Sequence, residues 1–427
     1  MPCIAPASLL VGAASADMSL PVGTLMGGYA NRTSACTGAL DPLYTRALLL
    51  QQGNSTCLIV TLDALAINVE WADRLHVVAA RACSIAAADV RVICSHTHSG
   101  AALSDMFGES AAKAAYFEQV MSAVQDASAL AGSQRIACTL RAGSIPYPIG
   151  RNRRMRPGHA QVTALEHAQG ADIDHTLTAL RFDDARTGAA VATLFHTACH
   201  PVCLGPENTL ASGDYAGIAA QFIERHTGAP AMFFNGAAGN ITPIIGRGSS
   251  YAATQALGQE VGQQVLNLPD IEQTPDLSIE PRRSVALPLG CRMCHREDIE
   301  RAANGLRDLD TGFNGWAEEV NHWSGRMQSL LSQGALKDTV DIALSAVRIG
   351  DTRFVFIGAE VFNEYQLWAP SNTRIVSYAD GESCYVPTAA ALSGGGYEVT
   401  TSPVFYGLPC APSADAEGVL RRQIGDW

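Results

Sequence analysis

The sequence has few charged residues, and fewer basic than acidic ones. Charged side chains make up 16% of its 427 residues, below the roughly 25% of an average globular protein, and hydrophobic residues make up 47%. This composition excludes a disordered chain, which would lack apolar area to bury, and argues against a coiled coil. Lysine and arginine total 29 against 41 aspartate and glutamate residues, for a formal net charge of −12. We therefore expect no nucleic-acid partner, because phosphate recognition needs clustered basic side chains.

Long hydrophobic segments are also missing. No uninterrupted apolar run reaches the ~18 residues of a transmembrane helix. Residues 4–16 are small and apolar, and Ala14-Ser15-Ala16 resembles a signal-peptide cleavage site, but no basic residue precedes them. We interpret Leu9–Ala13 as a first strand and predict a cytoplasmic protein. The alternative is an exported protein in which residues 1–16 act as a signal.

The 12 cysteines do not form the pattern of a disulfide framework. Several lie inside apolar runs, such as Cys57 and Cys94, where a thiol behaves as a small hydrophobic group. Reduced cysteines in a reducing compartment are the prediction. The segment Cys291-Arg292-Met293-Cys294-His295 has the spacing of a metal or redox site, but no second ligand pair lies nearby, so its role stays open.

Short β-branched runs alternate with longer helical patterns, which is typical of an α/β protein. We predict a mixed β-sheet core flanked by helices, folded as a single large catalytic domain over residues 1–427. The expected strands are Cys57–Leu62, Val90–Cys94, Ile136–Arg141, Thr176–Phe182, Ala190–Phe195, Ala231–Phe234, Ser284–Leu287, Val340–Ile349, Arg353–Ile357 and Thr373–Tyr378. The expected helices are Trp71–Ala87, Ala111–Ala131, Tyr215–Arg225, Tyr251–Asn267, Arg296–Leu331 and Glu360–Leu367. Residues 296–331, with breaks expected at Gly312 and Gly315, form a helical excursion, a lid or a solvated helical pair.

Chemically active residues follow several of the expected strands. His96 and His98 come directly after one strand, His200 after another, and Glu360 after a third. In open α/β sheets the binding crevice lies beyond the carboxyl ends of the strands, so these side chains can converge. In an extended segment His96 and His98 point to the same side, where both bind one metal or one binds it while the other moves protons. The alternative is a pair of hydrogen-bonded core histidines.

Several other polar segments are candidates for a structural or a functional role. Glu360 is expected at a helix start, where a carboxylate is a cap or, beside two histidines, the third ligand of a catalytic zinc. Asp214 is predicted to be the N-cap of the helix that begins at Tyr215. Residues 236–240 form either an oxyanion-binding turn beside the hydroxyl of Thr242 or a turn needed for close packing. The basic cluster 151–156 could supply one arginine to hold a carbonyl or carboxylate group.

Taken together, these segments resemble, in order and over nearly the whole chain, the catalytic N-terminal domain of the neutral/alkaline non-lysosomal ceramidase family. The matching segments are Gly27-Gly28-Tyr29-Ala30, Ser95-His96-Thr97-His98-Ser99-Gly100, Asn152-Arg153, His200-Pro201, Ser212-Gly213-Asp214-Tyr215-Ala216-Gly217, Gly239-Asn240-Ile241-Thr242-Pro243, Glu360 and Cys384-Tyr385-Val386. The chain is similar to a short member that lacks the family's C-terminal immunoglobulin-like domain.

The resemblance implies a set of site residues. One Zn²⁺ per chain would be held by His96, His200, Glu360 and Tyr385. His98 and Arg153 would line the site as the acid–base and substrate-polarising groups. Thr242 stands where the family has a serine, and Tyr397 corresponds to a further tyrosine, although residues 389–396 depart from the family pattern.

We therefore predict a zinc-dependent hydrolase that cleaves an amide bond with metal-activated water. The expected partner is a small soluble N-acyl substrate, with an ester or lactone as further possibilities. The alternatives are a true ceramidase acting on N-acylsphingosine, a hydrolase with Thr242 as nucleophile, and a non-catalytic metal- or ligand-binding protein on the same scaffold. The sequence specifies neither the acyl chain, the metal ion nor the oligomeric state.

Overall fold

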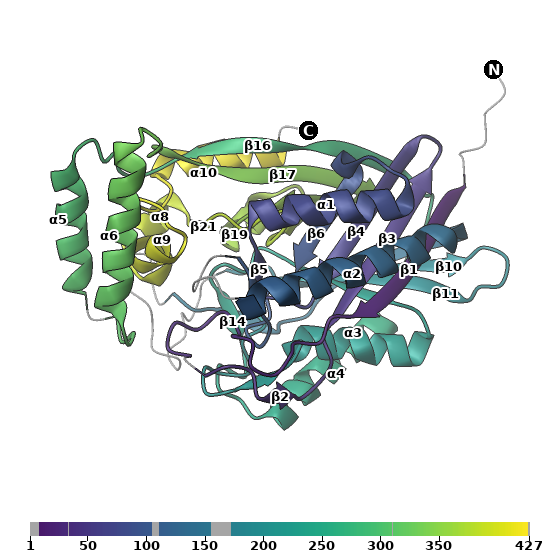
Figure 1. Ribbon diagram of the computed structural model, residues 1–427. Coiled ribbons are helices and arrows are strands. Elements are labelled where there is room, and N and C mark those ends of the chain that lie inside the picture. Colours follow the sequence, from purple (N-terminus) through teal and green to yellow (C-terminus); the bar gives the residue numbers. More distant parts are fainter. Residues whose placement is uncertain (1–7, 33, 105–110, 155–171, 310, 426–427) are drawn as a thin grey trace, which may run out of the picture.

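Two β-sheets lie face to face and carry helices on their outer surfaces in the computed structural model of the chain (Figure 1). The structure describes residues 8–32, 34–104, 111–154, 172–309 and 311–425. The larger sheet is mixed, with strand order β13-β11-β10-β8-β1-β3-β4-β6 and with β15 pairing to β8. The smaller has the order β16-β17-β18-β20. The predicted α/β class with a mixed sheet and flanking helices is confirmed.

The strands of the two sheets have the following bounds. The larger sheet contains β1 (Leu9–Asp17), β3 (Tyr44–Gln52), β4 (Ser55–Leu62), β6 (Val90–Cys94), β8 (Ile136–Pro146), β10 (Thr176–Asp184), β11 (Ala190–Thr197), β13 (Ala231–Asn235) and β15 (Ile271–Gln273). The smaller contains β16 (Leu277–Pro288), β17 (Thr339–Ile349), β18 (Thr352–Ile357) and β20 (Thr373–Val376). Short two-residue or three-residue strands pair elsewhere: β2 (Gly38–Ala39), β5 (Ala66–Ile67), β7 (Ala102–Leu103), β9 (Gly150–Asn152), β12 (Leu210–Ala211), β14 (Ile241–Pro243), β19 (Glu360–Val361) and β21 (Tyr385–Val386).

The helices cover the outer faces of this sandwich. They are α1 (Val69–Cys83), α2 (Ala111–Ser133), α3 (Asp214–Thr227), α4 (Tyr251–Asn267), α5 (Arg296–Arg307), α6 (Trp316–Ser332), α7 (Glu364–Trp368), α8 (Ala389–Leu392), α9 (Ser402–Phe405) and α10 (Ala414–Gly425), with a 3₁₀ turn at Ala87–Asp89 and a π-helical turn at Tyr397–Thr401. Helices α1 and α2 share one core with the outer face of β3, β4 and β6, and α3 and α4 share another with β10, β11 and β13. Within the described residues, no helix is long and apolar enough to cross a bilayer.

Strand β3 is absent from the sequence prediction. Its sequence YTRALLLQQ contains residues with good helix propensity, and it lacks polar alternation because both of its faces are buried. Ala47 and Leu49 point toward α1 and α2, whereas Leu48 and Leu50 point into the core between the two sheets. Strand β1, expected over Leu9–Ala13, is present and pairs with β3 along eight residues from Leu10 to Asp17.

Local backbone geometry corrects two predicted helix boundaries and accounts for a third. The first helix ends at Cys83 rather than Ala87, because Ser84 takes a left-handed conformation and caps it. The helix expected from Glu360 begins only at Glu364, since Glu360 instead pairs with Tyr385 in a short parallel bridge of strands. The 296–331 segment divides into α5 and α6 around Gly312 and Gly315, both with positive φ, as predicted.

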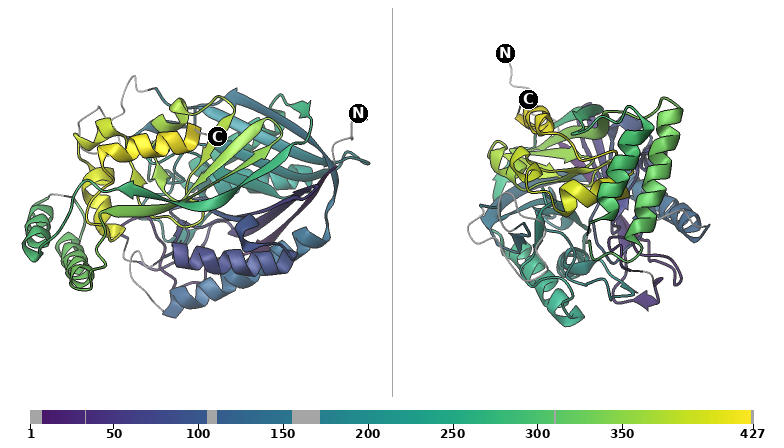
Figure 2. Two further views of the ribbon diagram at one scale, coloured as in Figure 1. Left: turned by 90° about the horizontal axis from the view of Figure 1, so that it is seen from above. Right: turned by 90° about the vertical axis from the view of Figure 1, so that its left-hand side faces the viewer.

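The α5–α6 pair stands at one end of the molecule, beside the C-terminal segments (Figure 2). The pair leaves the smaller sheet after β16 and returns at β17, which is the antiparallel neighbour of β16. Val320, Trp323 and Met327 of α6 share a small core with Val404, and the Trp323 indole nitrogen donates to the Leu408 carbonyl oxygen at 2.7 Å. The excursion is therefore packed on the C-terminal segment.

All described cysteines are free thiols, in agreement with the prediction. Cys3 and residues 1–7 of the 1–16 signal alternative lie outside the described residues, as do Met155 and Arg156 of the basic cluster. Among the described residues, Cys291 and Cys294 do not belong to a group of three or more potential metal ligands. Cys294 is exposed, whereas the pKa of Cys291 is lowered by a hydrogen bond with the Cys410 thiol.

Candidate metal centre

The two edges of the larger sheet meet at the site. Strands β6 and β13 lie at opposite ends of the sheet order, yet the Asn235 side chain at the end of β13 donates to the Ser95 carbonyl oxygen after β6 at 3.1 Å. The Cys199 amide donates to the same Asn235 side chain at 3.4 Å. Residues 377–380, which follow β20, hydrogen-bond to both edges. The histidine-bearing loops are thereby held beside one another by backbone contacts.

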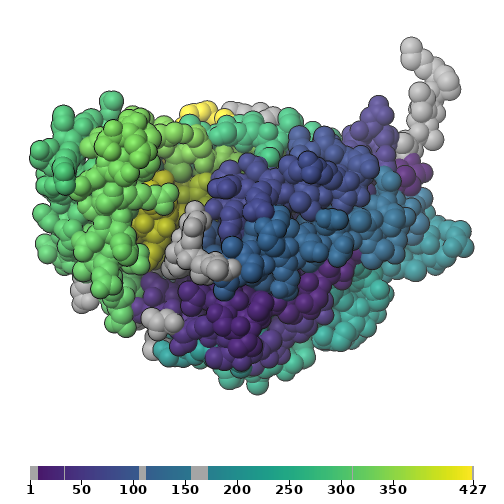
Figure 3. Space-filling model, in the orientation of Figure 1, coloured from purple at the N-terminus to yellow at the C-terminus, as the bar shows by residue number. Residues whose placement is uncertain are grey.

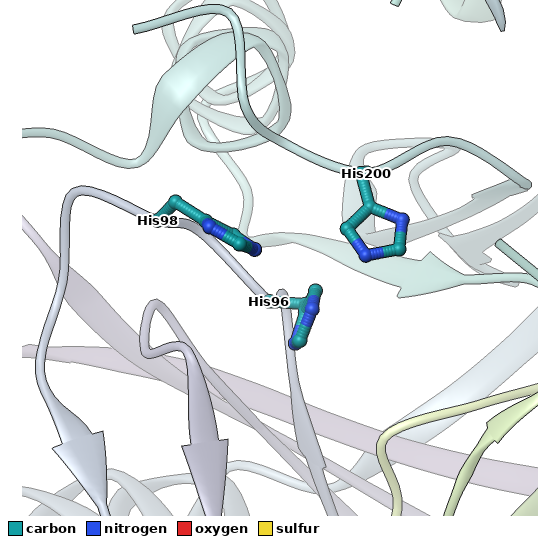
Figure 4. A group of neighbouring side chains, drawn as sticks. All are labelled: His96, His98 and His200. Carbon is teal, nitrogen blue, oxygen red and sulfur yellow. The ribbon is translucent and has the colours of Figure 1, made fainter. Parts of the chain in front are cut away.

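Three histidines converge at this point, as the strand-end pattern predicts (Figure 4). One ring nitrogen from each of His96, His98 and His200 lies within 4.8 Å of the others, and His96 and His200 are buried. The expected extended conformation of His96 is wrong, because its φ is +67°. The left-handed turn, rather than strand alternation, brings His96 and His98 to the same cavity.

Hydrogen bonds fix the tautomers of two of these histidines. His96 Nδ1 donates to the Leu65 carbonyl oxygen at 2.8 Å, and His200 Nδ1 donates to the Ala238 carbonyl oxygen at 2.6 Å. Each ring is thereby left with Nε2 as the nitrogen that can bind a metal ion. These contacts are the outer support that metal-ligating histidines usually have.

Glu360 completes the arrangement. Its Oε2 atom lies 3.3 Å from His96 Nε2 and 3.1 Å from His200 Nε2, so one carboxylate oxygen faces two ring nitrogens. Burial alone would raise the pKa of Glu360, but interactions with His96 and His200 hold that pKa well below its usual range. Two imidazole nitrogens and one carboxylate oxygen directed at one point are the donor set of a catalytic zinc site. The residues present therefore fit a divalent metal ion.

His98 differs from the other two histidines. Neither of its ring nitrogens has a hydrogen-bond partner among the described residues. Burial lowers the pKa of His98 well below its usual value, and the neighbouring His96 and His200 lower it further. A neutral imidazole with two free nitrogens at the cavity wall can act either as a third ligand or as a proton acceptor.

Arg153 and Tyr385 form the polar wall opposite the histidines. An Nη atom of Arg153 donates to the Tyr385 hydroxyl oxygen at 3.1 Å, and both side chains line the cavity. Tyr385 lies in β21, which pairs with the strand that carries Glu360. Tyr397 lines the same cavity, with its ring centroid 5.8 Å from that of Tyr385.

A buried carboxylate that the sequence analysis missed holds this wall in place. Glu398, fully buried on the π-helical turn, accepts from Arg153 Nε at 2.8 Å and from Arg154 Nη1 at 2.5 Å. Burial would raise the pKa of Glu398, but the two guanidinium groups hold it below the usual range. In the sequence, only the adjacent Tyr397 pointed to this turn, because the turn has no periodic pattern of hydrophobic residues.

Glu382 and Tyr406 are also new members of the site. The Tyr406 hydroxyl donates to Glu360 Oε1 at 2.7 Å and also contacts Glu382. Burial raises the pKa of Glu382 to about 8, and the adjacent Glu360 adds to this shift. Glu382 lies in the loop that follows β20, as His96 lies in the loop that follows β6, so the strand-end pattern contains a signal for it.

Thr242 is placed away from the cavity wall. It lies in β14, opposite Arg151 of β9, and it is not among the residues that line the cavity. Its hydroxyl has no hydrogen-bond partner within the described part of the chain, so no side chain is positioned there as a base. The geometry gives Thr242 no activated hydroxyl.

The turn at residues 236–240 packs closely against the segments that carry the ligands. The Gly236 and Gly239 amides donate to the carbonyl oxygens of Thr197 and Val361. A Cβ atom at Gly239 would lie 2.9 Å from the carbonyl oxygens of Glu360 and Val361. The close-packing interpretation is supported, because the turn lies against the backbone of Glu360 and supplies the carbonyl that orients His200.

The predicted N-cap role of Asp214 is wrong. Gly213 is the N-cap of α3, and Asp214 is its first residue, with a φ of +54°. Its buried carboxylate accepts from the Leu204 amide at 3.0 Å and from the Tyr215 amide at 2.7 Å. Asp214 therefore ties α3 to the loop that follows His200.

The cavity above the histidines has a volume of about 100 Å³. Its walls come from distant parts of the chain, with the residues Gly28, Tyr29, Ala30, Leu65, His96, His98, Arg153, Val202, Arg247, Phe313, Glu360, Glu382, Tyr385, Tyr397, Phe405 and Tyr406. Phe313 comes from the turn between α5 and α6, and Asn31 accepts from the adjacent Asn314 amide at 3.0 Å. In Figure 3, C-terminal residues in yellow lie recessed between the green α5–α6 pair and the purple and blue N-terminal segments.

Gly28 has no side chain and so leaves room for the imidazole ring of His98. Gly28 has a φ of +94°, and a Cβ atom there would lie 2.3 Å from His98 Nδ1. Gly28→Ala is expected to displace the imidazole and to lower kcat by roughly 100-fold, the usual contribution of a positioned acid–base group. Gly23→Ala is the matched control, because Gly23 has a φ of +91° but no atom within 4 Å of its added Cβ.

Both glycine variants carry the backbone strain of a positive φ, about 1–3 kcal/mol, so their unfolding midpoints should fall by similar amounts. Only Gly28→Ala should lose activity, measured as kcat on an amide substrate. Equal kcat values for the two variants would contradict the position assigned to His98.

Comparisons with known proteins identify the family and the fold of the chain. The family model described as neutral/alkaline non-lysosomal ceramidase, N-terminal, matches residues 9–249. The fold is similar to that of a neutral ceramidase from Pseudomonas aeruginosa, with a TM-score of 0.70 and 17% identity over 98% of this chain and 73% of that one. A ceramidase complexed with C2 gives a TM-score of 0.69 and 17% identity over 98% of this chain and 74% of that one. No curated protein matches the sequence.

Proposed function

Because the chain belongs to the neutral/alkaline non-lysosomal ceramidase family, we propose that it is a zinc-dependent hydrolase that cleaves the amide bond of a small N-acylated substrate. The observation that carries this proposal is the convergence of two Nε2 atoms, from His96 and His200, on one oxygen of Glu360. His96, His200 and Glu360 would hold the ion, with Tyr385 as the fourth ligand. The ligands come from positions 96 to 385, so we propose that the chain works as one catalytic unit.

A bound zinc ion polarises a carbonyl oxygen and lowers the pKa of a water molecule to about 7. The remaining chemistry belongs to the chain. His98 takes a proton from the attacking water and returns it to the leaving amine nitrogen, since both of its ring nitrogens are free. Arg153, held by Glu398, donates to the carbonyl oxygen as negative charge develops there. Tyr397 lines the cavity beside Arg153 and helps to exclude water.

The size of the cavity favours a small substrate over ceramide. Pockets for drug-sized ligands usually measure about 300–1,000 Å³, several times the roughly 100 Å³ found above the histidines. Phe313, Phe405 and Tyr397 provide an apolar wall for a short acyl group. N-acylsphingosine, with two long chains, is therefore the less favoured substrate.

Metal removal tests the proposal directly. We expect one zinc ion per chain by elemental analysis, loss of hydrolysis of short N-acyl amines after chelation, and recovery on addition of Zn²⁺. A threonine-nucleophile enzyme using Thr242 would keep its activity after chelation and would accumulate a covalent acyl-enzyme. A non-catalytic protein on this scaffold would bind the metal without turnover. Either result would refute the proposed mechanism.

A further inference from the structure

Arg247 stands at the mouth of the cavity on a rigid turn. It lies between Gly246 and Gly248, which have φ values of +80° and +77°. The Gly246 amide donates to the Pro243 carbonyl oxygen at 2.9 Å, and the Ser249 amide donates to that of Cys203 at 2.8 Å. The backbone beneath this exposed arginine is therefore fixed, and its side chain lines the cavity.

The other arginines near the cavity have their partners. Glu398 accepts from both Arg153 and Arg154. Arg32 donates to four backbone carbonyl groups, including that of His98 at 2.6 Å. Arg247, in contrast, has no ion pair or hydrogen bond with any residue in the part of the chain that the structure describes.

Among the described residues, no carboxylate pairs with the positive charge of Arg247. Loss of hydration at the cavity wall lowers the pKa of Arg247, and the charge of the nearby Arg153 lowers it further. The acidic residues of the cavity lie elsewhere: Glu360 faces His96 and His200, and Glu382 contacts Tyr406. An anion beside Arg247 would relieve this repulsion and would accept from a guanidinium fork.

We propose, resting on the amide hydrolase function above, that the substrate carries an anionic group, which Arg247 binds at the cavity mouth while the amide lies over the histidines. The chemical class is a short amide with one carboxylate end, such as an N-acylated amino acid. Arg247 is then a specificity-determining residue that contacts substrate but takes no part in proton transfer. The aromatic wall of Phe313 and Phe405 receives the apolar portion.

Matched substrates test the proposal. N-hexanoylglycine and N-hexanoylethanolamine share an acyl group and differ in charge, and the monopropylamide of adipic acid places the carboxylate on the acyl side instead. We expect kcat/KM for one of the anionic amides to exceed that of the neutral amide by roughly 10-fold or more, as for a hydrogen bond to a charged group. Its KM should rise with ionic strength, whereas that of the neutral amide should not.

The variant Arg247→Gln should remove this preference, because it should raise KM for the anionic amide by roughly 10-fold more than KM for the neutral amide. Arg186→Gln, an exposed arginine on the β10–β11 turn, is the control and should keep the preference. Equal kcat/KM values for anionic and neutral amides, or a preference that survives Arg247→Gln, would overturn the proposal.

Binding without turnover separates this proposal from the proposed function. Calorimetry on chelator-treated protein measures the affinity for N-hexanoylglycine, for adipic acid monopropylamide and for N-hexanoylethanolamine. Tighter binding of an anionic amide that Arg247→Gln abolishes supports the anion site even if no amide is hydrolysed. Equal binding of all three ligands refutes it even if hydrolysis proceeds.

Discussion

His200→Ala is expected to abolish stoichiometric zinc binding and amide hydrolysis together. Removing His200 Nε2 leaves Glu360 Oε2 with a single histidine neighbour and removes one of the buried ligands from the proposed centre. Loss of an outer-shell partner alone typically costs 10–100-fold in metal affinity, so loss of a ligand should cost more than about 100-fold. The measurements are zinc content after dialysis and kcat/KM on a short N-acyl amine.

His322→Ala is the matched control, because His322 is an exposed histidine on α6. It should bind zinc and hydrolyse substrate as the unmodified chain does. If His200→Ala retained one zinc ion per chain at unchanged affinity, the assigned ligand set would be wrong. Circular dichroism of both variants establishes that a loss of zinc does not reflect unfolding.

Glu398→Ala is expected to destabilise the fold as well as the site. It leaves Arg153 and Arg154 buried without their shared carboxylate, and breaking a buried ion pair in this way costs about 3–5 kcal/mol. It also frees Arg153 to move away from Tyr385, so kcat/KM should fall further than the stability loss explains. Urea unfolding and steady-state kinetics measure the two effects.

Two further variants separate the contribution of the Glu398 charge from its role in positioning Arg153. Glu398→Gln keeps the shape and one acceptor oxygen, and we expect a smaller loss of stability. In the double variant Glu398→Ala with Arg154→Met, one unpaired cation is gone, so the loss should be less than the sum of the single losses. Additive losses, or a Glu398→Ala protein with unchanged kcat/KM, would show that Glu398 does not position Arg153.

The sequence predicts those parts of the site that lie at strand ends. Each buried strand has a recognisable apolar run, and a histidine directly after such a run is fixed in space by the strand itself, as for His96 and His200. Thr242 also follows a buried strand, β13, but it lies opposite Arg151 and does not line the cavity. The turn before it is held in place by close contacts between Gly239 and β19. Strand-end position therefore predicts location better than it predicts the direction of a side chain.

The residues that sequence reasoning missed depend on long-range packing. Glu398 is 245 residues from Arg153 and sits on a π-helical turn with no periodic signature. Tyr406 reaches Glu360 only because α9 packs against α6. Strand β3 was missed for a local reason, because its sequence YTRALLLQQ lacks polar alternation and contains residues with good helix propensity.

The α5–α6 pair has a consequence for how this scaffold can diversify. The pair is a long connection between two antiparallel strands. The chain leaves the smaller sheet at Pro288 and returns to it at Thr339, and these two residues are paired in the β16–β17 register. Its length and sequence can change without shifting that register. The wall that carries Phe313 is thus an exchangeable module, whereas His96, His200 and Glu360 are built into the ends of strands. Chimeras that swap residues 289–338 between relatives, but keep the α6 residues Val320, Trp323 and Met327 that pack on α9, would alter which acyl groups fit while leaving the ligand geometry in place.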